Sequence, residues 1–155
     1  MQTSLFVLVI VALVPNLLLG AGGIDRLIVQ VPGWFRIGPV AFARYARATD
    51  LGNGLVLYPV LGISAPLLTL ASLVVALVQH ASTQVTTLLV VASVLSVLHS
   101  ITTTQAAPTM MRVGRAGDDE AAIAPLMDRF ARISVVRAVL QALTAAVLLW
   151  ALIAR

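Results

Sequence analysis

Long apolar stretches separated by short polar connections constrain this chain more than any other feature. They run from Leu5 to Gly23, from Leu55 to Val78, from Val85 to Ile101 and from Val135 to Ile153. A helix rises about 1.5 Å per residue, so each stretch is long enough to cross a hydrocarbon core of about 30 Å. The sequence therefore predicts an all-α integral membrane four-helix bundle, in which every polar side chain inside a span needs a physical reason.

Composition supports a single membrane domain. Hydrophobic residues make up 60% of the chain and charged residues 10%, which leaves no room for a soluble domain. We expect residues 1–155 to form one domain with spans at about 4–22, 55–78, 85–105 and 133–154. The net charge of +4 does not indicate nucleic acid as a partner, because the basic residues are all Arg and lie at helix ends near lipid headgroups. Cysteine is absent, which excludes disulfides and thiolate-ligated metal centres.

The distribution of arginine predicts the orientation in the membrane. Eight arginines fall in the two long connections, namely Arg26, Arg36, Arg44 and Arg47 in the first and Arg112, Arg115, Arg129 and Arg132 in the second. The turn at 79–84 carries no arginine, and only Arg155 at the C-terminus favours the opposite orientation. The positive-inside rule then makes both long connections cytoplasmic. We expect a multi-pass protein of the inner (plasma) membrane with its N- and C-termini outside.

The long connections are expected to contain structure of their own. Gly20–Gly23 should close the first span, and Pro39–Thr49 should form a short interfacial helix with aromatic side chains at headgroup level. Leu51–Gly54 is typical of a turn. Asp118–Glu120 should open a helix that continues through Pro125 into the last span, because acidic residues are favoured at a helix N-terminus.

Polar side chains from all the spans fall at one depth. Asn16, Tyr58, His99 and Arg137 each lie about 6–9 Å in from the cytoplasmic end of their span, and Gln141 lies one turn deeper. Sites inside helix bundles are built in this way from facing helices. We therefore expect His99 and Arg137 to be catalytic. The expected substrate-binding residues are Asn16, Tyr58, Gln141, Trp34 and Thr103.

Each of these residues also has a structural interpretation. Arg137 could extend its charge to the interface, and a backbone carbonyl or a neighbouring hydroxyl could satisfy His99. Asn16 could repair the backbone gap left by the preceding proline, and Tyr58 could belong to an aromatic belt. Asp25 and Arg26 are expected to pair with one another at the interface.

The sequence favours neither a metal site nor a cofactor. His80 and His99 are predicted near opposite faces of the membrane, so they cannot share a metal ion or a haem. Asp118–Glu120 is more typical of a solvated helix start than of a metal site. A pore is also not favoured, because the spans contain no ring of like charges.

The layout resembles the anthrone-oxygenase-like family of small four-span membrane proteins. The matching features are Gly20–Gly23, Val31-Pro32 with Trp34, an amphipathic stretch to Asn53, Pro59, Ala107-Pro108 and the segment Arg129–Arg137. Family members often carry a His where this chain has Ser134, and asparagines near the positions of Thr104-Gln105 and Thr109. The resemblance implies a link to the oxidation of anthrones to anthraquinones without a cofactor.

Residues and resemblance together predict a membrane enzyme that acts on a lipophilic, aromatic polyketide-like molecule. His99 would be the general base, and Arg137 would stabilise the resulting enolate or phenolate. The reaction would be oxygenation or a proton-transfer cyclisation or isomerisation. The alternative is a non-enzymatic carrier, exporter or accessory subunit. Its support is a set of small residues suited to helix contacts within or between chains, which leaves a homo-oligomer open: Ser93, Ser96, Ser100, Ala142, Ala145 and Ala146.

Overall fold

The computed structural model describes residues 2–154, and every element in this part of the chain is helical. The elements in order are α1 (Thr3–Asp25), η1 (Arg26–Gln30), α2 (Val31–Ile37), α3 (Pro39–Ala48), η2 (Thr49–Asn53), α4 (Gly54–Val78), α5 (Thr83–Arg115) and α6 (Glu120–Ile153), where η1 and η2 are π-helices. The four helical segments that contain α1, α4, α5 and α6 are long and apolar enough to cross a membrane. The predicted all-α four-helix membrane bundle is confirmed.

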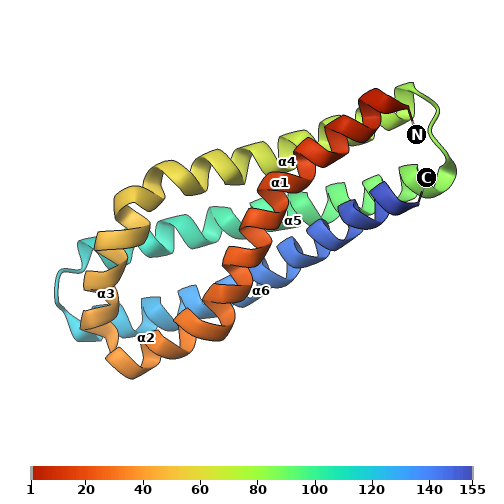
Figure 1. Cartoon of the computed structure of the whole chain (residues 1–155). Coiled ribbons are helices and arrows are strands. Elements are labelled where there is room, and N and C mark those ends of the chain that lie inside the picture. The colour runs from red at the N-terminus through yellow and green to blue at the C-terminus, as the bar shows by residue number, and fades with distance from the viewer. Residues whose placement is uncertain (1, 155) are drawn as a thin grey trace.

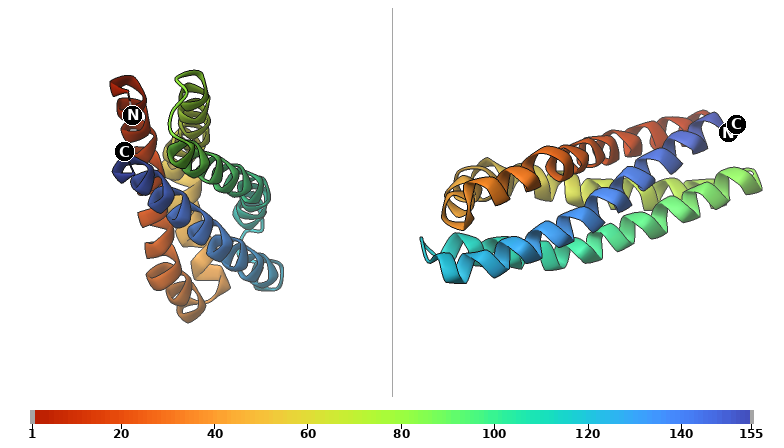
Figure 2. Two further views of the ribbon diagram at one scale, coloured as in Figure 1. Left: turned by 90° about the vertical axis from the view of Figure 1, so that its right-hand side faces the viewer. Right: turned by 90° about the horizontal axis from the view of Figure 1, so that it is seen from below.

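The four long helices run along one another, and the bundle has two distinct ends (Figure 1). Both ends of the chain lie at one of them, together with the α4–α5 turn, and we call this the terminal end. The short helices α2 and α3 and the α5–α6 turn lie at the other, and the further views agree (Figure 2). We call this second end the basic end, because it carries the arginines of both long connections.

Two of the long helices extend well past the expected spans at the basic end. α5 continues to Arg115 rather than stopping near residue 105, and α6 begins at Glu120 rather than near residue 133. The extensions remain helical because they have an apolar face to bury, including Met110 on α5 and Ile123 on α6. As predicted, α6 starts in the acidic segment, where Asp119 caps it by accepting a hydrogen bond from the Ala122 N–H at 3.1 Å.

The glycines of the first span have a different role from the one expected. α1 does not close at Gly20–Gly23 but continues to Asp25 and into η1. A Cβ at Gly23 would lie 3.1 Å from the Cα of Ala138, and one at Gly20 would lie 3.6 Å from the Cα of Ala142. The prediction that they close the span is wrong, because these glycines allow the backbones of α1 and α6 to approach closely.

The connection between α1 and α4 is almost continuously helical. The expected helix after Gly38 is present as α3, with Pro39 as its first residue, and its position at a membrane interface stays a prediction. The expected turn before α4 takes the form of the π-helix η2, which is interrupted at Gly52 (φ −94°, ψ −116°).

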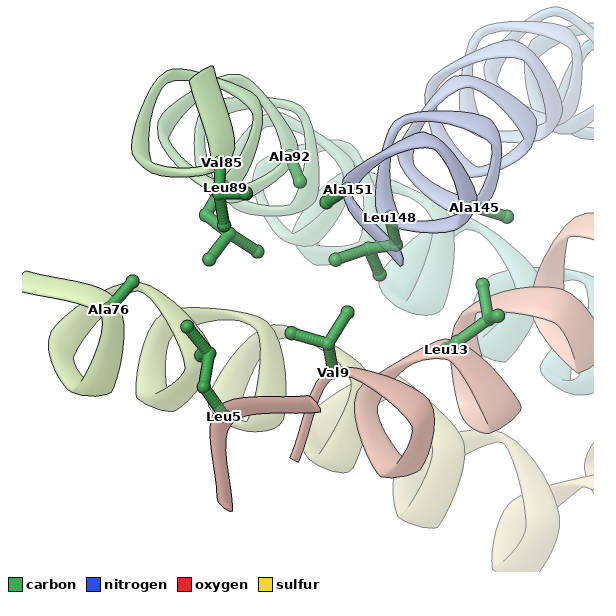
Figure 3. Packing of buried hydrophobic residues seen from close by; sticks show 10 residues of the cluster. All are labelled: Leu5, Val9, Leu13, Ala76, Val85, Leu89, Ala92, Ala145, Leu148 and Ala151. Atoms are coloured by element: carbon green, nitrogen blue, oxygen red, sulfur yellow. The ribbon is translucent and has the colours of Figure 1, made fainter. Parts of the chain in front are cut away.

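Apolar side chains form two separate cores. The core at the terminal end draws on all four long helices, with Leu5, Val9, Leu89 and Leu148 fully buried among them (Figure 3). The core at the basic end is richer in large and sulfur-containing side chains: Trp34, Phe42, Met110, Val113, Ile123, Met127 and Phe130, with several alanines. The polar residues singled out in the sequence lie between these two cores.

Candidate functional site

A cavity of about 660 Å³ lies between the two cores. All four long helices and the two π-helices contribute to its wall, which is mostly apolar and includes Leu19, Leu61 and Met110. This volume is within the range of small-molecule sites in proteins.

The cavity lies where α1 diverges from α4 along the bundle. At the terminal end α1 is joined to α4, where the side-chain amide of Gln79 donates to the Ser4 hydroxyl at 2.8 Å. Towards the basic end Gly20 and Gly23 hold α1 against α6 instead. α1 therefore crosses the bundle away from α4 (Figures 1 and 2), and the cavity occupies the space between them.

His99 lines this cavity as a buried, oriented imidazole. Its side chain is 4% exposed, and Nδ1 lies 3.3 Å from the backbone carbonyl oxygen of Arg137. A carbonyl oxygen only accepts, so in this hydrogen bond Nδ1 carries the proton. In the neutral ring Nε2 is then a proton acceptor, and it is buried with no hydrogen-bond partner in the described chain. A backbone carbonyl thus satisfies one ring nitrogen, as the structural interpretation allowed, while the other is left available.

Arg137 contributes a cation to the same wall. Its side chain lines the cavity, and its Nε is buried without a hydrogen-bond partner among residues 2–154. No carboxylate in that part of the chain forms a salt bridge with it. One residue therefore orients the His99 ring through its backbone and supplies an unpaired guanidinium through its side chain.

Ser134 is a site residue that the sequence reasoning noticed only as a departure from a family pattern. It is 4% exposed, lines the cavity, and its hydroxyl has no hydrogen-bond partner in the described chain. It lies three residues before Arg137, so both side chains point to the same face of α6. That spacing was the signal available in the sequence.

Arg26 and Asp50 form a second polar group at the basic end of the cavity. The Arg26 guanidinium donates to the Asp50 carboxylate at 2.8 Å and to the Tyr58 hydroxyl at 3.1 Å. The two charged side chains are only 14% and 9% exposed. The expected pairing of Asp25 with Arg26 is wrong. Asp25 instead accepts from the side-chain amide of Gln30 at 2.6 Å, since adjacent helical residues do not face each other.

Three aromatic rings surround the Arg26 guanidinium. Its central carbon lies 5.4 Å from the ring centre of Tyr58, 5.7 Å from that of Phe130 and 5.8 Å from that of Trp34. Cation–π attraction adds to the ion pair in fixing this arginine. Trp34 itself does not line the cavity; it packs against Phe42 with ring centres 4.9 Å apart. Its position supports Arg26 rather than a bound molecule.

The remaining predicted residues divide between the cavity and the bundle interior. Tyr58 and Thr103 line the cavity, and the Thr103 hydroxyl donates to the backbone oxygen of His99 at 3.0 Å. Asn16 and Gln141 do not line it. They are buried against each other, with the Gln141 amide donating to the Asn16 side-chain oxygen at 2.6 Å.

Asn16 also contacts α4 and its own helix. Its amide donates to the Thr69 hydroxyl at 3.1 Å and to the backbone oxygen of Ala12 at 2.7 Å. With Gln141 it forms a polar layer that joins α1, α4 and α6 on the terminal side of the cavity. The expected direct contact of Asn16 and Gln141 with a substrate has no support in this arrangement.

The charges along the wall determine what the cavity suits. Arg26 and Asp50 neutralise each other. Asp25 and Arg137 both line the cavity without a salt-bridge partner among residues 2–154, but Asp25 is exposed, whereas the Arg137 Nε is buried. Such a wall suits a molecule with an apolar body and an acidic or acceptor oxygen. Among residues 2–154, no group of three His, Asp or Glu side chains lies close enough to hold a metal ion.

Comparison with known proteins finds no matching family model, no matching curated protein and no matching solved structure. The site must therefore be interpreted from its own geometry.

Proposed function

We propose that this protein is a membrane enzyme that removes a proton from a lipophilic, aromatic, polyketide-like molecule. The observation that carries the proposal is the pairing of two unused groups in one cavity. They are the buried, unpartnered Nε2 of His99 and the unpaired guanidinium of Arg137. Buried polar groups are normally satisfied, so groups left without partners beside a cavity favour a role toward a bound molecule.

In the proposed mechanism His99 Nε2 accepts a proton from a C–H or O–H group of the substrate. The electrons left behind form an enolate or phenolate, whose oxygen is stabilised by the Arg137 guanidinium and by the Ser134 hydroxyl. Arginine remains protonated in proteins, so it stabilises the oxyanion without itself transferring a proton. Thr103 helps to fix the turn of α5 that carries His99.

Two reactions can follow from the same anion. In an oxygenation the electron-rich anion reacts with O₂, a CH₂ group becomes a carbonyl, and the second oxygen atom leaves as water. The resemblance to the anthrone-oxygenase-like family supports this version. In a cyclisation or isomerisation the proton returns at another atom and no oxygen is consumed.

The orientation belongs to the same proposal. The exposed arginines of the basic end favour the cytoplasmic face of the inner (plasma) membrane for that end, with both termini outside. A cytoplasm-active reporter fused to the C-terminus tests this orientation. We expect no reporter activity, and strong activity would reverse the topology.

The carrier, exporter or accessory-subunit alternative receives less support. Of the small residues that suit contacts between chains, Ser93, Ser96 and Ala145 are buried within a single bundle, Ser100 and Ala142 are partly buried, and Ala146 is exposed. Most of this set is therefore already used in packing within one chain, which favours the enzyme.

The test is product analysis under labelled oxygen. Protein in lipid nanodiscs is incubated with an anthrone and ¹⁸O₂, and the rate is compared with that of empty nanodiscs, since anthrones also oxidise unaided. We expect a product with one labelled carbonyl, formed by wild type but not by His99→Ala. Ser96→Ala is the matched control, because this serine is buried on the same helix but does not line the cavity. A product of unchanged mass would limit the proposed reaction to proton transfer. Failure to form any product faster than empty nanodiscs do would contradict the proposed function.

A further inference from the structure

We infer that the cavity takes its ligand directly from the bilayer, through a side opening between α1 and α4. We also infer that this ligand is an apolar, ring-bearing molecule with one acidic oxygen that is bound by Arg137. The choice of an acidic oxygen rests on the proposed function, whereas the route of entry rests on the geometry of α1 and α4.

The first observation is the divergence of the two helices. The last side-chain link between α1 and α4 before the cavity is the hydrogen bond from Asn16 to Thr69. Beyond it α1 lies against Ala138 and Ala142 of α6. Among residues 2–154, the next hydrogen bonds across the space between α1 and α4 come where η1 begins, and they are made by Arg26.

The second observation is that the wall on this side is apolar and open. Leu18 on α1 and Leu55 on α4 both line the cavity, although they are 56% and 52% exposed. A residue that borders a cavity and is also exposed marks a rim. These two rim residues are leucines on membrane-spanning helices, so this part of the opening faces lipid, whereas the exposed Asp25 marks a polar edge of the rim near η1.

The third observation is that the basic end of this space is closed. Arg26 connects η1 to Asp50 on η2 and to Tyr58 on α4, and the ion pair is largely buried. The core formed by Trp34, Phe42 and their neighbours lies behind it. A molecule dissolved in the membrane thus meets an apolar opening, while one in water meets a bonded and packed cap.

Two glycines provide a way to obstruct this route without disturbing the bundle. Gly22 and Gly62 both line the cavity, and a Cβ at either position would have no atom within 4 Å. Gly22 is exposed and lies at the α1 rim, whereas Gly62 is partly buried inside. Larger residues at these positions would occupy empty space, and a helix tolerates them better than glycine.

The experiment measures binding of a hydroxyanthraquinone with one phenol, and of its methyl ether, to protein in neutral phosphatidylcholine nanodiscs. We expect Gly22→Trp to slow association of both probes at least about tenfold, and Gly62→Trp to weaken binding of both by a similar factor. Gly22→Ala and Gly33→Trp should behave as wild type. Gly33 likewise has no atom within 4 Å of an added Cβ, but it does not line this cavity. Arg137→Gln should remove the preference for the phenol and leave binding of the ether.

Met111 identifies the competing route, because it is an exposed cavity residue on α5, on the other side of α4. If Met111→Trp slowed association while Gly22→Trp did not, the opening between α1 and α4 would be refuted. Unchanged association in both variants would refute entry from the side altogether. Melting temperatures recorded in parallel identify any variant that fails to fold. If the binding pattern is as expected but no turnover is found, only the proposed function is refuted. If Gly22→Trp binds its ligand at the wild-type rate and turns it over fully, only the inferred route of entry is refuted.

Discussion

The two halves of this bundle are built from the same four helices, but one half is tightly packed and the other holds a cavity. At the terminal end Leu5, Val9, Leu89 and Leu148 close the interior completely. Towards the basic end the helices separate around a cavity whose wall contains a buried ion pair, an unpaired arginine and side chains with unsatisfied hydrogen bonds. Within residues 2–154, the largely buried charges of Arg26, Asp50 and Arg137 thus lie in the half with room for a ligand.

The difference between the halves originates in one helix. α1 packs with both α4 and α6 in the closed half and stays against α6 in the open half, where two glycines allow the close approach. The closed half holds the ends of all four helices together, so the open half tolerates imperfect packing. We therefore expect mutations in the open half to change activity more than stability, and mutations in the closed half to do the reverse.

The largest expected effect is loss of turnover in the open half. His99→Ala should reduce kcat about 10²–10⁴-fold, because it removes the proposed general base. Arg137→Lys should also be severely impaired, since a point charge does not replace a planar guanidinium. The double mutant should be little worse than His99→Ala, because groups that act as one unit are not additive. Near-wild-type activity of Arg137→Lys, with an unchanged melting temperature, would end the catalytic assignment of that residue.

The matching effect in the closed half is on stability. Leu148→Ala should lower the free energy of unfolding by about 2–4 kcal/mol, because it leaves a void in a fully buried site. Turnover per folded molecule should not change. Unfolding in a graded detergent mixture measures the first quantity, and activity normalised to folded protein measures the second. A large fall in normalised activity would show that the two halves are not separable.

A smaller effect is expected at Ser134. Ser134→Ala should reduce turnover about tenfold, the loss of one hydrogen bond to a charged oxygen. Ser93→Ala and Ser96→Ala are the matched controls, because their hydroxyls are equally buried and unpartnered but do not line the cavity. Equal losses in all three variants would indicate that Ser134 acts only through packing.

The smallest effect concerns the surface of the basic end. The Arg44 guanidinium, hydrogen-bonded to Asp118, holds the pKa of that carboxyl below its usual value. A lowered folded-state pKa stabilises the fold above the unfolded pKa of about 3.9, and this contribution is lost as the pH falls through the folded value. Asp118→Asn should thus lower the melting temperature slightly at pH 7, with the difference from wild type vanishing in acid. Asp128→Asn is the control, because Asp128 is exposed and forms no salt bridge in the described chain. A difference that persisted in acid would contradict the assignment.

The architecture could be predicted from hydropathy and capping signals. Apolar length predicts the membrane spans, and the acidic residues before Ala121 predict where α6 begins. The extension of α5 was missed because Pro108 and the polar residues around it resemble a helix end. Met110 and Val113 are buried in one core with Ile123 and Met127 of α6, and this packing favours the helix in that segment.

The sequence predicts how far along its helix each candidate site residue lies, but not which side chains contact one another. His99, Arg137, Tyr58 and Thr103 do share a cavity, because distance along a helix converts directly into depth in the membrane. Asn16 and Gln141 share nearly the same depth but bond to each other instead, and depth alone does not reveal which way a side chain turns. The Arg26–Asp50 pair could not be predicted from the sequence. Its residues lie in two π-helices, and α-helical spacing does not give the direction of side chains there.

The two π-helices also make the spacing of this segment sensitive to length. Each α-helical residue turns the chain by about 100°, and a π-helix places an additional residue within a turn. Loss of the additional residue of η1 would leave Trp34 nearly in place, whereas a residue added in α-helical geometry would rotate it by about 100° relative to the start of α1. With such an insertion the cap of the cavity would lose an aromatic ring even though no residue of the site had been substituted. In this stretch the number of residues is as much a determinant of function as their identity.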